Sequence, residues 1–545
     1  MTDAIVVGAG PNGLVAANTL VDAGWSVVVL EGAARPGGAV RSAELTEPGF
    51  THDLFSSFYP LAAASPIIGS FGLERYGLRW RRAPTVLAHP RTDGTCPTLH
   101  MDLAATAASL DSSSPGAGAA WERLYGLWQR VGTDVIKALF TPFPPVGSIA
   151  RLMAKLGPKE LIRFARFSVL PLRRLAEEEF GDPDAAIMLA GNALHSDLAP
   201  ESPLSGFFGW LLTSLGQQVG YPVPEGGSGK LVEALVRRLE ERGAEVHCNQ
   251  HVVNIDVRSG RAAGVTTHDG TSFTASRAVL ADVGAPNLYL DLVAREHLPA
   301  DLFDDIRRFH YDNATVKVDW ALDSGIPWKS EEAKSAGTVH VADDMDAFTM
   351  TAAELSMGLI PSRPFLVMGQ MTTTDPTRSP AGTETAWAYT HVPQNIRGDS
   401  GGELTGSWDT NETEAFVERM EDQIEALAPG FRDLVRGRHV MTPRTIEDTD
   451  ANLVGGAVNG GTAQLHQQLI FRPTPGLARP ETPVKGLYLA SASAHPGGGV
   501  HGAPGANAAK AALWGWRRRK LTLPVGAGLG AAGVLALLRR GSKDE

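Results

Sequence analysis

The sequence predicts an α/β fold in which a discontinuous parallel-sheet domain is interrupted by an inserted α+β domain. Three observations lead to this prediction. A strand, a glycine-rich turn and a helix open the chain at 4–23, a helix followed by short strands occupies 231–281, and a strand, a glycine-rich loop and a helix recur at 486–513. Strands that alternate with helices in this order are typical of a Rossmann-like sheet.

The turn after the first strand carries Gly8, Gly10 and Gly13. In such a turn the first glycine permits a sharp reversal of the chain, and the second lets the backbone approach a pyrophosphate. The third lets the following helix pack closely on the strand. A glycine-rich turn in an unrelated α/β domain is the alternative interpretation, and the elements that follow the turn decide between the two.

The helix predicted over 11–23 begins with Pro11 and Asn12, and its N-terminus directs free amides and a positive dipole end toward bound phosphates. A second apolar strand at 26–30 ends in Glu31. A carboxylate at this place accepts hydrogen bonds from both hydroxyls of a ribose. The order of strand, helix, strand and acid therefore predicts a dinucleotide site.

A second glycine pair and an arginine follow this acid, as Gly37, Gly38 and Arg41 in the segment 35–42. Here the sequence resembles the FAD-binding amine oxidase and phytoene desaturase superfamily, in which a GG-x-x-R-[ST] segment follows the dinucleotide fold. In that superfamily the segment wraps the FAD diphosphate. The resemblance implies that the cofactor is FAD and that these three residues lie near its pyrophosphate.

Another glycine-rich segment lies near the C-terminal end, where a Leu-Tyr-Leu strand is followed by His-Pro-Gly-Gly-Gly-Val at 495–500. It resembles the C-terminal flavin motif of carotenoid desaturases, whose amides lie along the isoalloxazine edge and the ribityl chain. The resemblance places four residues beside the flavin: Gly497, Gly498, Gly499 and Val500. A Val-x-x-Ile segment at 252–255 matches the part of the superfamily that covers the adenine, which makes Val252 a further cofactor-binding residue.

The resemblance extends from 5 to 513 and divides the chain into six parts. They are the three pieces of the FAD-binding domain at 1–85, 221–300 and 455–516, a helical substrate or membrane-contact region at 86–220, a substrate domain at 301–454, and a basic and apolar tail at 517–545. The inserted α+β domain of the predicted fold is thus the substrate domain.

The net charge, the cysteine spacing and the first residues argue against several classes of protein. The net charge is −11 and no basic surface dominates, which argues against a nucleic-acid partner. Cys96 and Cys248 lie far apart and form neither a metal-ligand spacing nor a redox pair, so we expect no metal centre and a reducing, cytoplasmic setting. The first three residues lack the positive region of a secretory signal peptide. The oligomeric state does not follow from the sequence.

FAD brings the hydride chemistry, so the protein has to position a C–H bond and tune its surroundings. His495, beside the C-terminal glycines, is the candidate catalytic residue, with His501 and His195 behind it. A lone histidine is also a common hydrogen-bonded structural residue, and this alternative stays open. The pair His52 and Asp53 likewise fits either chemistry or local hydrogen bonding.

The resemblance implies an oxidoreductase that desaturates a hydrophobic, unsaturated substrate of the carotenoid or isoprenoid class by hydride transfer to flavin N5. Related family members saturate or isomerise double bonds, and the sequence does not separate these directions. An amine oxidase and a non-catalytic, membrane-associated flavin-binding scaffold are further alternatives. His501 stands where phytoene desaturases usually have proline, and 221–227 is longer than their Tyr-Pro-x-Gly-Gly, which argues against phytoene itself.

Two features point toward a membrane. The tail carries 18 uncharged residues at 521–538, and at about 1.5 Å per residue these span roughly 27 Å, close to a hydrocarbon core of about 30 Å. Basic residues flank the run, whereas Pro524 and four glycines disfavour a helix in water. The predicted role is a membrane anchor, and a disordered or loosely docked tail is the alternative. The helix predicted at 152–172 mixes Phe and Leu with Lys and Arg, which allows further membrane contact.

Overall fold

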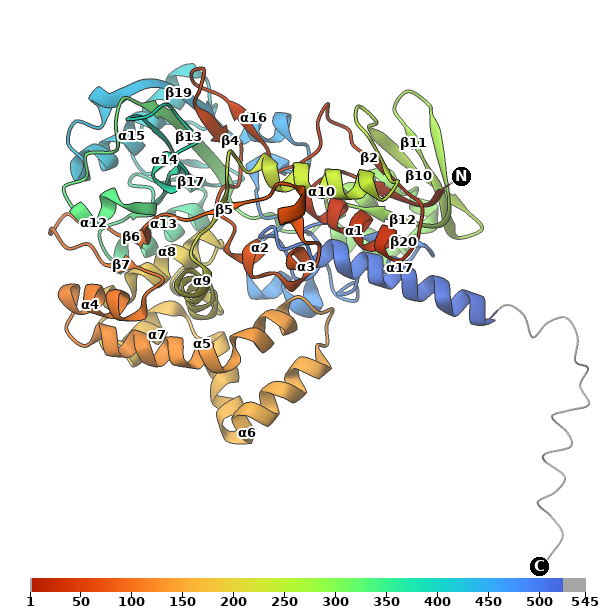
Figure 1. Ribbon diagram of the computed structural model, residues 1–545, viewed down its shortest axis with the longest axis horizontal. Coiled ribbons are helices and arrows are strands. Elements are labelled where there is room, and N and C mark those ends of the chain that lie inside the picture. The colour runs from red at the N-terminus through yellow and green to blue at the C-terminus, as the bar shows by residue number, and fades with distance from the viewer. Residues whose placement is uncertain (1, 523–545) are drawn as a thin grey trace, which may run out of the picture.

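The computed structural model describes residues 2–522 and contains two large sheets, which lie in opposite halves of the molecule (Figure 1). The first sheet has seven strands: β1 (Thr2–Val7), β2 (Val27–Leu30), β9 (Glu245–His247), β10 (Val252–Arg258), β11 (Arg261–Thr267), β12 (Ser272–Ala281) and β20 (Leu487–Leu489). Its parallel core runs β20-β12-β1-β2-β9, and β10 and β11 extend it as a hairpin. Three distant stretches of the chain therefore build one sheet.

The side chains of β1 alternate between the two faces of this sheet. Ala4 and Val6 belong to the core on the helical face, whereas Ile5 and Val7 belong to the core on the opposite face. The helical face is covered by α1 (Pro11–Asp22), α10 (Gly229–Glu241) and α17 (Ala503–Thr522). A parallel strand that is buried on both faces requires a continuous apolar run, which is what the sequence provides here.

The second sheet runs in the order β19-β13-β17-β16-β14-β6-β7. Its strands are β6 (Thr85–Ala88), β7 (Thr98–Leu99), β13 (Ala314–Leu322), β14 (Ala336–Val341), β16 (Leu366–Gln370), β17 (Glu384–Val392) and β19 (Val435–Met441). Val316 and Val318 of β13 pack with α15 (Thr410–Leu427). The alternate residues point away from α15, so Lys317 and its cross-strand neighbour Tyr389 lie on the opposite face. That face is polar and aromatic.

The remaining elements surround the two sheets. The helices are α2 (Pro60–Ala64), α3 (Pro66–Gly69), α4 (Leu103–Ser113), α5 (Ala117–Leu139), α6 (Val146–Val169), α7 (Leu172–Glu179), α8 (Ile187–His195), α9 (Ser205–Val219), α11 (Ala300–Ile306), α12 (Glu331–Lys334), α13 (Met345–Met357), α14 (Met371–Thr374) and α16 (Pro443–Thr449). Short strands pair as β3 (Ser42–Glu44) with β4 (Thr51–Asp53), β5 (Trp80–Arg81) with β8 (Val223–Pro224), and β15 (Leu359–Ile360) with β18 (Gly398–Asp399). The predicted α/β fold, with a discontinuous Rossmann-like domain and an inserted α+β domain, is confirmed.

The structure bears differently on the two segments that were predicted to contact a membrane, the helix at 152–172 and the apolar run of the tail. Within residues 2–522, every helix is too short or too polar to cross a bilayer. The apolar run predicted as an anchor lies outside the described residues from position 523 onward, so the anchor stays a prediction.

Candidate functional site

The turn that joins β1 to α1 has the geometry of a phosphate cradle and is called the phosphate cradle below. Gly8 adopts a φ of +93°, and its N–H donates to the Leu30 carbonyl at 2.8 Å, which ties the turn to β2. A Cβ on Gly13 would lie 2.2 Å from the Gly8 carbonyl oxygen, so only glycine lets α1 approach β1 this closely. Gly10 is the N-cap of α1, and Pro11 is its first residue. The N-terminus of α1 thus lies at the carboxyl end of the sheet, where such folds bind their phosphates.

Asn12 supplies an observation that fits a bound cofactor. Its side-chain Oδ1 is buried and has no hydrogen-bond partner in the described part of the chain. Because buried polar atoms are nearly always hydrogen-bonded, this atom calls for a partner from outside the chain, either a ligand or a water molecule. The start of α17 packs on the same turn, since a Cβ on Gly505 would lie 1.9 Å from the Asn12 carbonyl oxygen.

Glu31 follows β2 and lies beside this turn. Its two carboxylate oxygens accept one backbone N–H each, from Ala9 at 2.7 Å and from Ala33 at 2.8 Å. Each oxygen keeps a further acceptor position for a ribose hydroxyl. The N–H groups of 249 and 250 donate to the carbonyls of Ala33 and Glu31, which brings the start of β10, and with it Val252, next to the same acid.

Gly37 and Gly38 pack against the turn. The Gly37 N–H donates to the Ala9 carbonyl at 3.0 Å, and a Cβ on Gly38 would lie 3.2 Å from the Cα of Gly10. The Nε of Arg41 donates to the Gly38 carbonyl at 2.8 Å. The structure therefore brings the two N-terminal motifs together at one place, with a basic residue beside them.

Sequence reasoning missed two acidic residues at this place. Asp282 follows β12, and its carboxylate accepts the Gly13 N–H at 2.7 Å, inside the first turn of α1. Burial raises the pKa of Asp282 to about 7, the hydrogen bond from Gly13 opposes this rise, and the charges of Glu31 and Asp450 add to it. Burial also raises the pKa of Asp450, against the opposing charge of Arg41. Two carboxyl groups with raised pKa values thus lie beside the phosphate cradle.

An apolar pocket adjoins the C-terminal glycine loop. It is lined by the loop itself at 497–499, by Leu139 of α5, and by Phe208, Leu211 and Leu212 of α9. The glycine loop connects β20 with the start of α17, so the pocket begins where the sheet of the Rossmann-like domain ends. A flavin bound along this loop would lie next to the apolar residues that line the pocket.

Among the described residues that line the pocket, Arg472 alone is charged at neutral pH. It is 1% exposed, and its guanidinium donates to backbone carbonyls, including those of Thr462 at 2.9 Å and Ala492 at 2.8 Å. Burial lowers the pKa of Arg472 to about 10, while the charge of Asp312 opposes this shift. A Cβ on Gly497 would lie 3.3 Å from the Arg472 Cζ. A fixed positive charge therefore lies beside the glycine loop.

His195, the last residue of α8, faces the same pocket. Many protein atoms lie around the imidazole of His195, which disfavours its charged form. The side chain also lines the pocket, and part of its surface is exposed to solvent. Its Nδ1 hydrogen-bonds with the hydroxyl of Tyr389 on β17, and its Nε2 has no hydrogen-bond partner within 2–522. Burial lowers the pKa of His195 to about 4 and raises the pKa of Tyr389, so both side chains are neutral at pH 7.

The two histidines beside the glycine loop are placed differently. The Nε2 of His495 pairs with the Thr141 carbonyl at 3.1 Å, and this side chain is not part of the pocket wall. His501 lines the pocket and stacks on Phe140, with ring centroids 4.5 Å apart. Burial lowers the pKa of His495 to about 4 and that of His501 to about 3. The Nδ1 of His501 accepts the Ala503 N–H at 3.1 Å. His495 also has a ring nitrogen without a hydrogen-bond partner among the described residues, its Nδ1, but it does not line the pocket, whereas His195 does.

The family of this chain follows from comparison with known proteins. Residues 12–338, more than half of the chain, match the family described as flavin containing amine oxidoreductase. The chain belongs to this family. The predicted resemblance to the amine oxidase superfamily is thus confirmed, and a flavin is the cofactor that membership implies.

Several known proteins are similar to this chain along nearly its whole length. The chain is 29% identical to mouse pyridine nucleotide-disulfide oxidoreductase domain-containing protein 2, over 93% of this chain and 92% of that one. It is 24% identical to the phytoene desaturase of Fusarium fujikuroi, over 91% of this chain and 86% of that one. The solved structure of putrescine oxidase with bound putrescine has a TM-score of 0.59 at 16% identity, over 94% of this chain and 98% of that one, which shows a shared fold.

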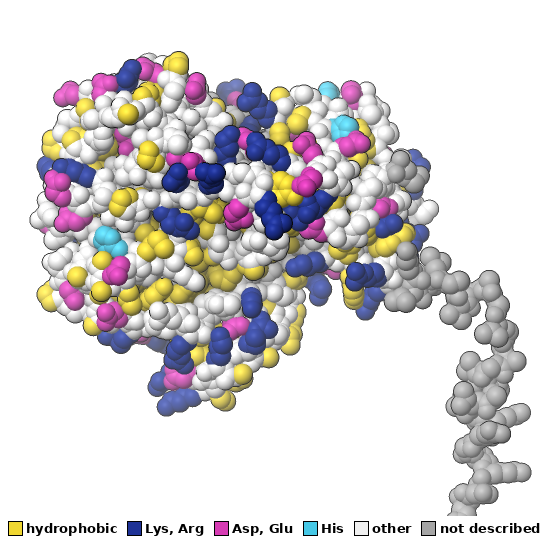
Figure 2. Space-filling view, viewed as in Figure 1, with side chains coloured by type: hydrophobic (Ala, Val, Ile, Leu, Met, Phe, Trp, Pro, Cys, Tyr) yellow, Lys and Arg dark blue, Asp and Glu magenta, His cyan; other side chains and the backbone are white. Residues whose placement is uncertain are grey.

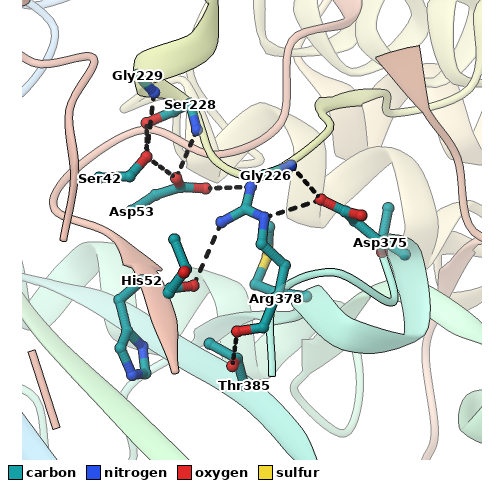
Figure 3. Close-up of polar contacts among 12 residues, drawn as sticks. Ser42, His52, Asp53, Gly226, Ser228, Gly229, Asp375, Arg378 and Thr385 are labelled. Carbon is teal, nitrogen blue, oxygen red and sulfur yellow. Dashed lines mark hydrogen bonds and ion pairs between the residues drawn. The ribbon is translucent and has the colours of Figure 1, made fainter. Parts of the chain in front are cut away.

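Asp53 has a long-range partner, Arg378 (Figure 3). It pairs with Arg378 at 3.0 Å, and Arg378 pairs with Asp375 at 3.2 Å, all three side chains being fully buried. Asp53 also accepts the Ser228 N–H, and Asp375 accepts the Gly226 N–H, each at 2.7 Å. The network joins β4, the loop before α10 and the segment after α14. These contacts favour a structural role for Asp53, which extends well beyond local hydrogen bonding.

Proposed function

We propose that this protein uses FAD to remove two hydrogens from neighbouring carbons of a hydrophobic, unsaturated substrate of the isoprenoid or carotenoid class. The observation that carries the proposal is the pocket, whose leucine and phenylalanine wall faces the glycine loop. Its charged lining residue is the cation Arg472, which would repel a substrate ammonium. The similarity to a phytoene desaturase supports the substrate class.

The residues that would hold FAD fall into three groups. The cradle, the ribose acid and the adjoining glycine pair with its arginine would hold the dinucleotide, the start of β10 would cover the adenine, and the C-terminal loop would hold the isoalloxazine. These residues are Gly8, Gly10, Pro11, Asn12, Gly13, Glu31, Gly37, Gly38, Arg41, Val252, Gly497, Gly498, Gly499 and Val500. FAD, when bound, supplies an acceptor for the two electrons of a hydride.

The residues that line the pocket would take up the proton that the reaction releases. When one carbon of a CH–CH pair loses a hydride, the neighbouring carbon must lose a proton for the double bond to form. With the Nδ1–H of His195 donating to Tyr389, the Nε2 of His195 carries a free lone pair that can hold this proton. Arg472, which lines the same pocket, would favour the negative charge that a flavin gains on accepting a hydride.

Anaerobic mixing of the FAD-loaded protein with isoprenoid hydrocarbons, polyenes and primary amines tests this function. We expect an isoprenoid or polyene to bleach the flavin and to yield a product that lacks two hydrogens. Bleaching by amines alone would assign the protein as an amine oxidase, and conversion only with pre-reduced flavin would assign a saturase or isomerase. A protein that neither bleaches nor converts any of them would be a flavin-binding scaffold.

The affinity for FAD is expected to fall about tenfold as the pH rises from 6 to 8. Asp282 is protonated below its pKa of about 7 and ionised above it, so at higher pH it adds a negative charge beside the diphosphate. Glu31 and Asp450 are the other acids at this place, and Arg41 is the base. Titration of the apoprotein with FAD, followed by flavin fluorescence, measures the effect.

Asp282→Asn is the matched variant, since its Oδ1 still accepts the Gly13 N–H while the charge is removed. Its affinity for FAD should stay constant between pH 6 and 8 and equal that of the unchanged protein at pH 6. A pH dependence in this variant that equals that of the unchanged protein would show that another group is responsible.

A further inference from the structure

Helix α6 projects from the body of the molecule (Figure 1). It is bent at Gly157, where φ is +70°, and four of its side chains are buried: Ser148, Leu152, Leu156 and Phe167. Phe164 and Phe167 pack on Trp210 of α9, with ring centroids 6.2 and 5.1 Å apart. α6 is thus attached along one side, and its other faces are directed outward.

Exposed apolar side chains are concentrated on these outward faces. They are Val146 at 67% exposure, Ile149 at 45%, Met153 at 42%, Ile162 at 72% and Val169 at 48%. Positions 146, 149 and 153 recur at helical spacing on the first half of the helix, and 162 and 169 do so on the second. Among residues 2–519, whose exposure the structure describes, this one helix holds five of the thirteen large hydrophobic side chains that are exposed, and such a concentration marks an interaction surface.

Basic side chains lie among the apolar ones. α6 contains five basic residues, which are Arg151, Lys155, Lys159, Arg163 and Arg166, and one acidic residue, Glu160. The helix itself is therefore positive in a chain whose net charge is −11, although Arg151 and Lys155 pair with Asp134 of α5. Arg166 likewise pairs with Glu178 of α7, and Arg163 pairs with Glu160 of the same helix. Figure 2 shows Lys and Arg side chains beside hydrophobic ones on this projecting part of the molecule.

We propose that α6 docks on the surface of an anionic lipid bilayer, with its exposed apolar side chains among the upper acyl chains and its basic side chains at the headgroups. A helix that mixes apolar and basic residues in this way is typical of the membrane interface. A protein partner fits less well, because the buried core of a protein interface is depleted in charged residues. The anionic surface is the partner that complements both kinds of side chain at once.

Docking would place the pocket close to the bilayer. α6 packs on α9 through Trp210, and Phe208, Leu211 and Leu212 of the same helix line the pocket. A lipophilic substrate dissolved in the bilayer would then lie one helix away from the pocket wall. This consequence rests on the proposed function, whereas the docking itself does not depend on any chemistry.

Sedimentation of the full chain with vesicles tests the docking. Vesicles of phosphatidylcholine with 30% phosphatidylserine should bind the protein, and pure phosphatidylcholine vesicles should bind it more weakly. The double variant Ile149→Ser with Ile162→Ser should bind the anionic vesicles about tenfold more weakly, because it removes inserted apolar surface. Met350→Ser with Met357→Ser on α13 is the matched control, since these side chains are 59% and 53% exposed and should not contribute.

A second readout separates α6 from the tail, which all these proteins share. In a background with Cys96→Ser and Cys248→Ser, a polarity-sensitive dye on Ile162→Cys should shift to the blue with anionic vesicles, whereas the same dye on Met350→Cys should not. An unchanged emission at position 162, equal binding by both double variants, or no binding by the full chain would overturn the proposal. None of these measurements needs flavin or substrate, so a failed docking and a failed desaturation are distinguishable.

Discussion

Replacing Arg378 with methionine is expected to lower the free energy of unfolding by about 3–5 kcal/mol, because the change leaves two buried carboxylates without a counter-charge. Arg378 pairs with Asp53 and Asp375, and all three side chains are fully buried. Burial acts to raise the pKa of Asp53, but the charge and hydrogen bonds of Arg378, with those from Ser228 and Ser42, hold it below its usual range. Urea denaturation at pH 7 measures the loss.

The control for this prediction is an exposed ion pair. Arg444 is 88% exposed in its pair with Asp448, so Arg444→Met should change the free energy of unfolding by less than about 1 kcal/mol. Because the pKa of Asp53 is lowered in the fold, its stabilising contribution is present above the unfolded pKa and disappears as the pH falls through the folded pKa. The destabilisation caused by Arg378→Met should therefore shrink toward acidic pH. If Arg378→Met were as stable as the unchanged protein at pH 7, the network of Asp53, Arg378 and Asp375 would not stabilise the fold.

The cofactor half of the site could be predicted because its requirements are local in sequence. The close approach of α1 to β1 demands glycine at position 13, and the tight turn demands it at position 8, so the spacing alone carries the information. The end of the second strand then fixes where Glu31 lies relative to this turn.

Contacts between distant segments are not marked by any local pattern, in the cofactor half as in the rest of the molecule. Asp282 meets Gly13 across 269 positions, and Asp53 meets Arg378 across 325 positions. The same holds for the second sheet, because the pairing of strands that are distant in the sequence leaves no local pattern in either strand.

The catalytic role predicted for His495 stays a prediction. His495 adjoins the glycine loop in the sequence, and its Nε2 pairs with the Thr141 carbonyl, whereas its buried Nδ1 has no hydrogen-bond partner in the described part of the chain. His195 comes from α8 and reaches the pocket only because that helix ends against β17, where Tyr389 meets it across 194 positions. Adjacency to a motif locates a residue along the chain, whereas catalysis depends on which way the side chain points.

Replacing His195 with alanine is expected to slow flavin reduction by substrate by about 10²–10⁴-fold, the range of a lost general base. FAD affinity should be unchanged, because His195 touches the pocket and not the phosphate cradle. Since the pKa of His195 is lowered to about 4, the rate in the unchanged protein should be flat between pH 6 and 8 and fall as the pH approaches 4. Stopped-flow absorbance at saturating substrate measures the rate.

Two further variants separate a base from a packing residue. Tyr389→Phe removes the hydroxyl that orients His195, so it should slow flavin reduction by a smaller factor than loss of the imidazole and leave substrate affinity nearly intact. His495→Gln tests the histidine beside the glycine loop. If His495→Gln reduces its flavin slowly while His195→Ala reduces it as fast as the unchanged protein, then His495 is the base. The last criterion is the fall in rate at acidic pH. If His195 is the base, this fall follows its protonation and is lost in His195→Ala. If His195 only fills space, the rate does not depend on its protonation, and His195→Ala keeps the pH profile of the unchanged protein.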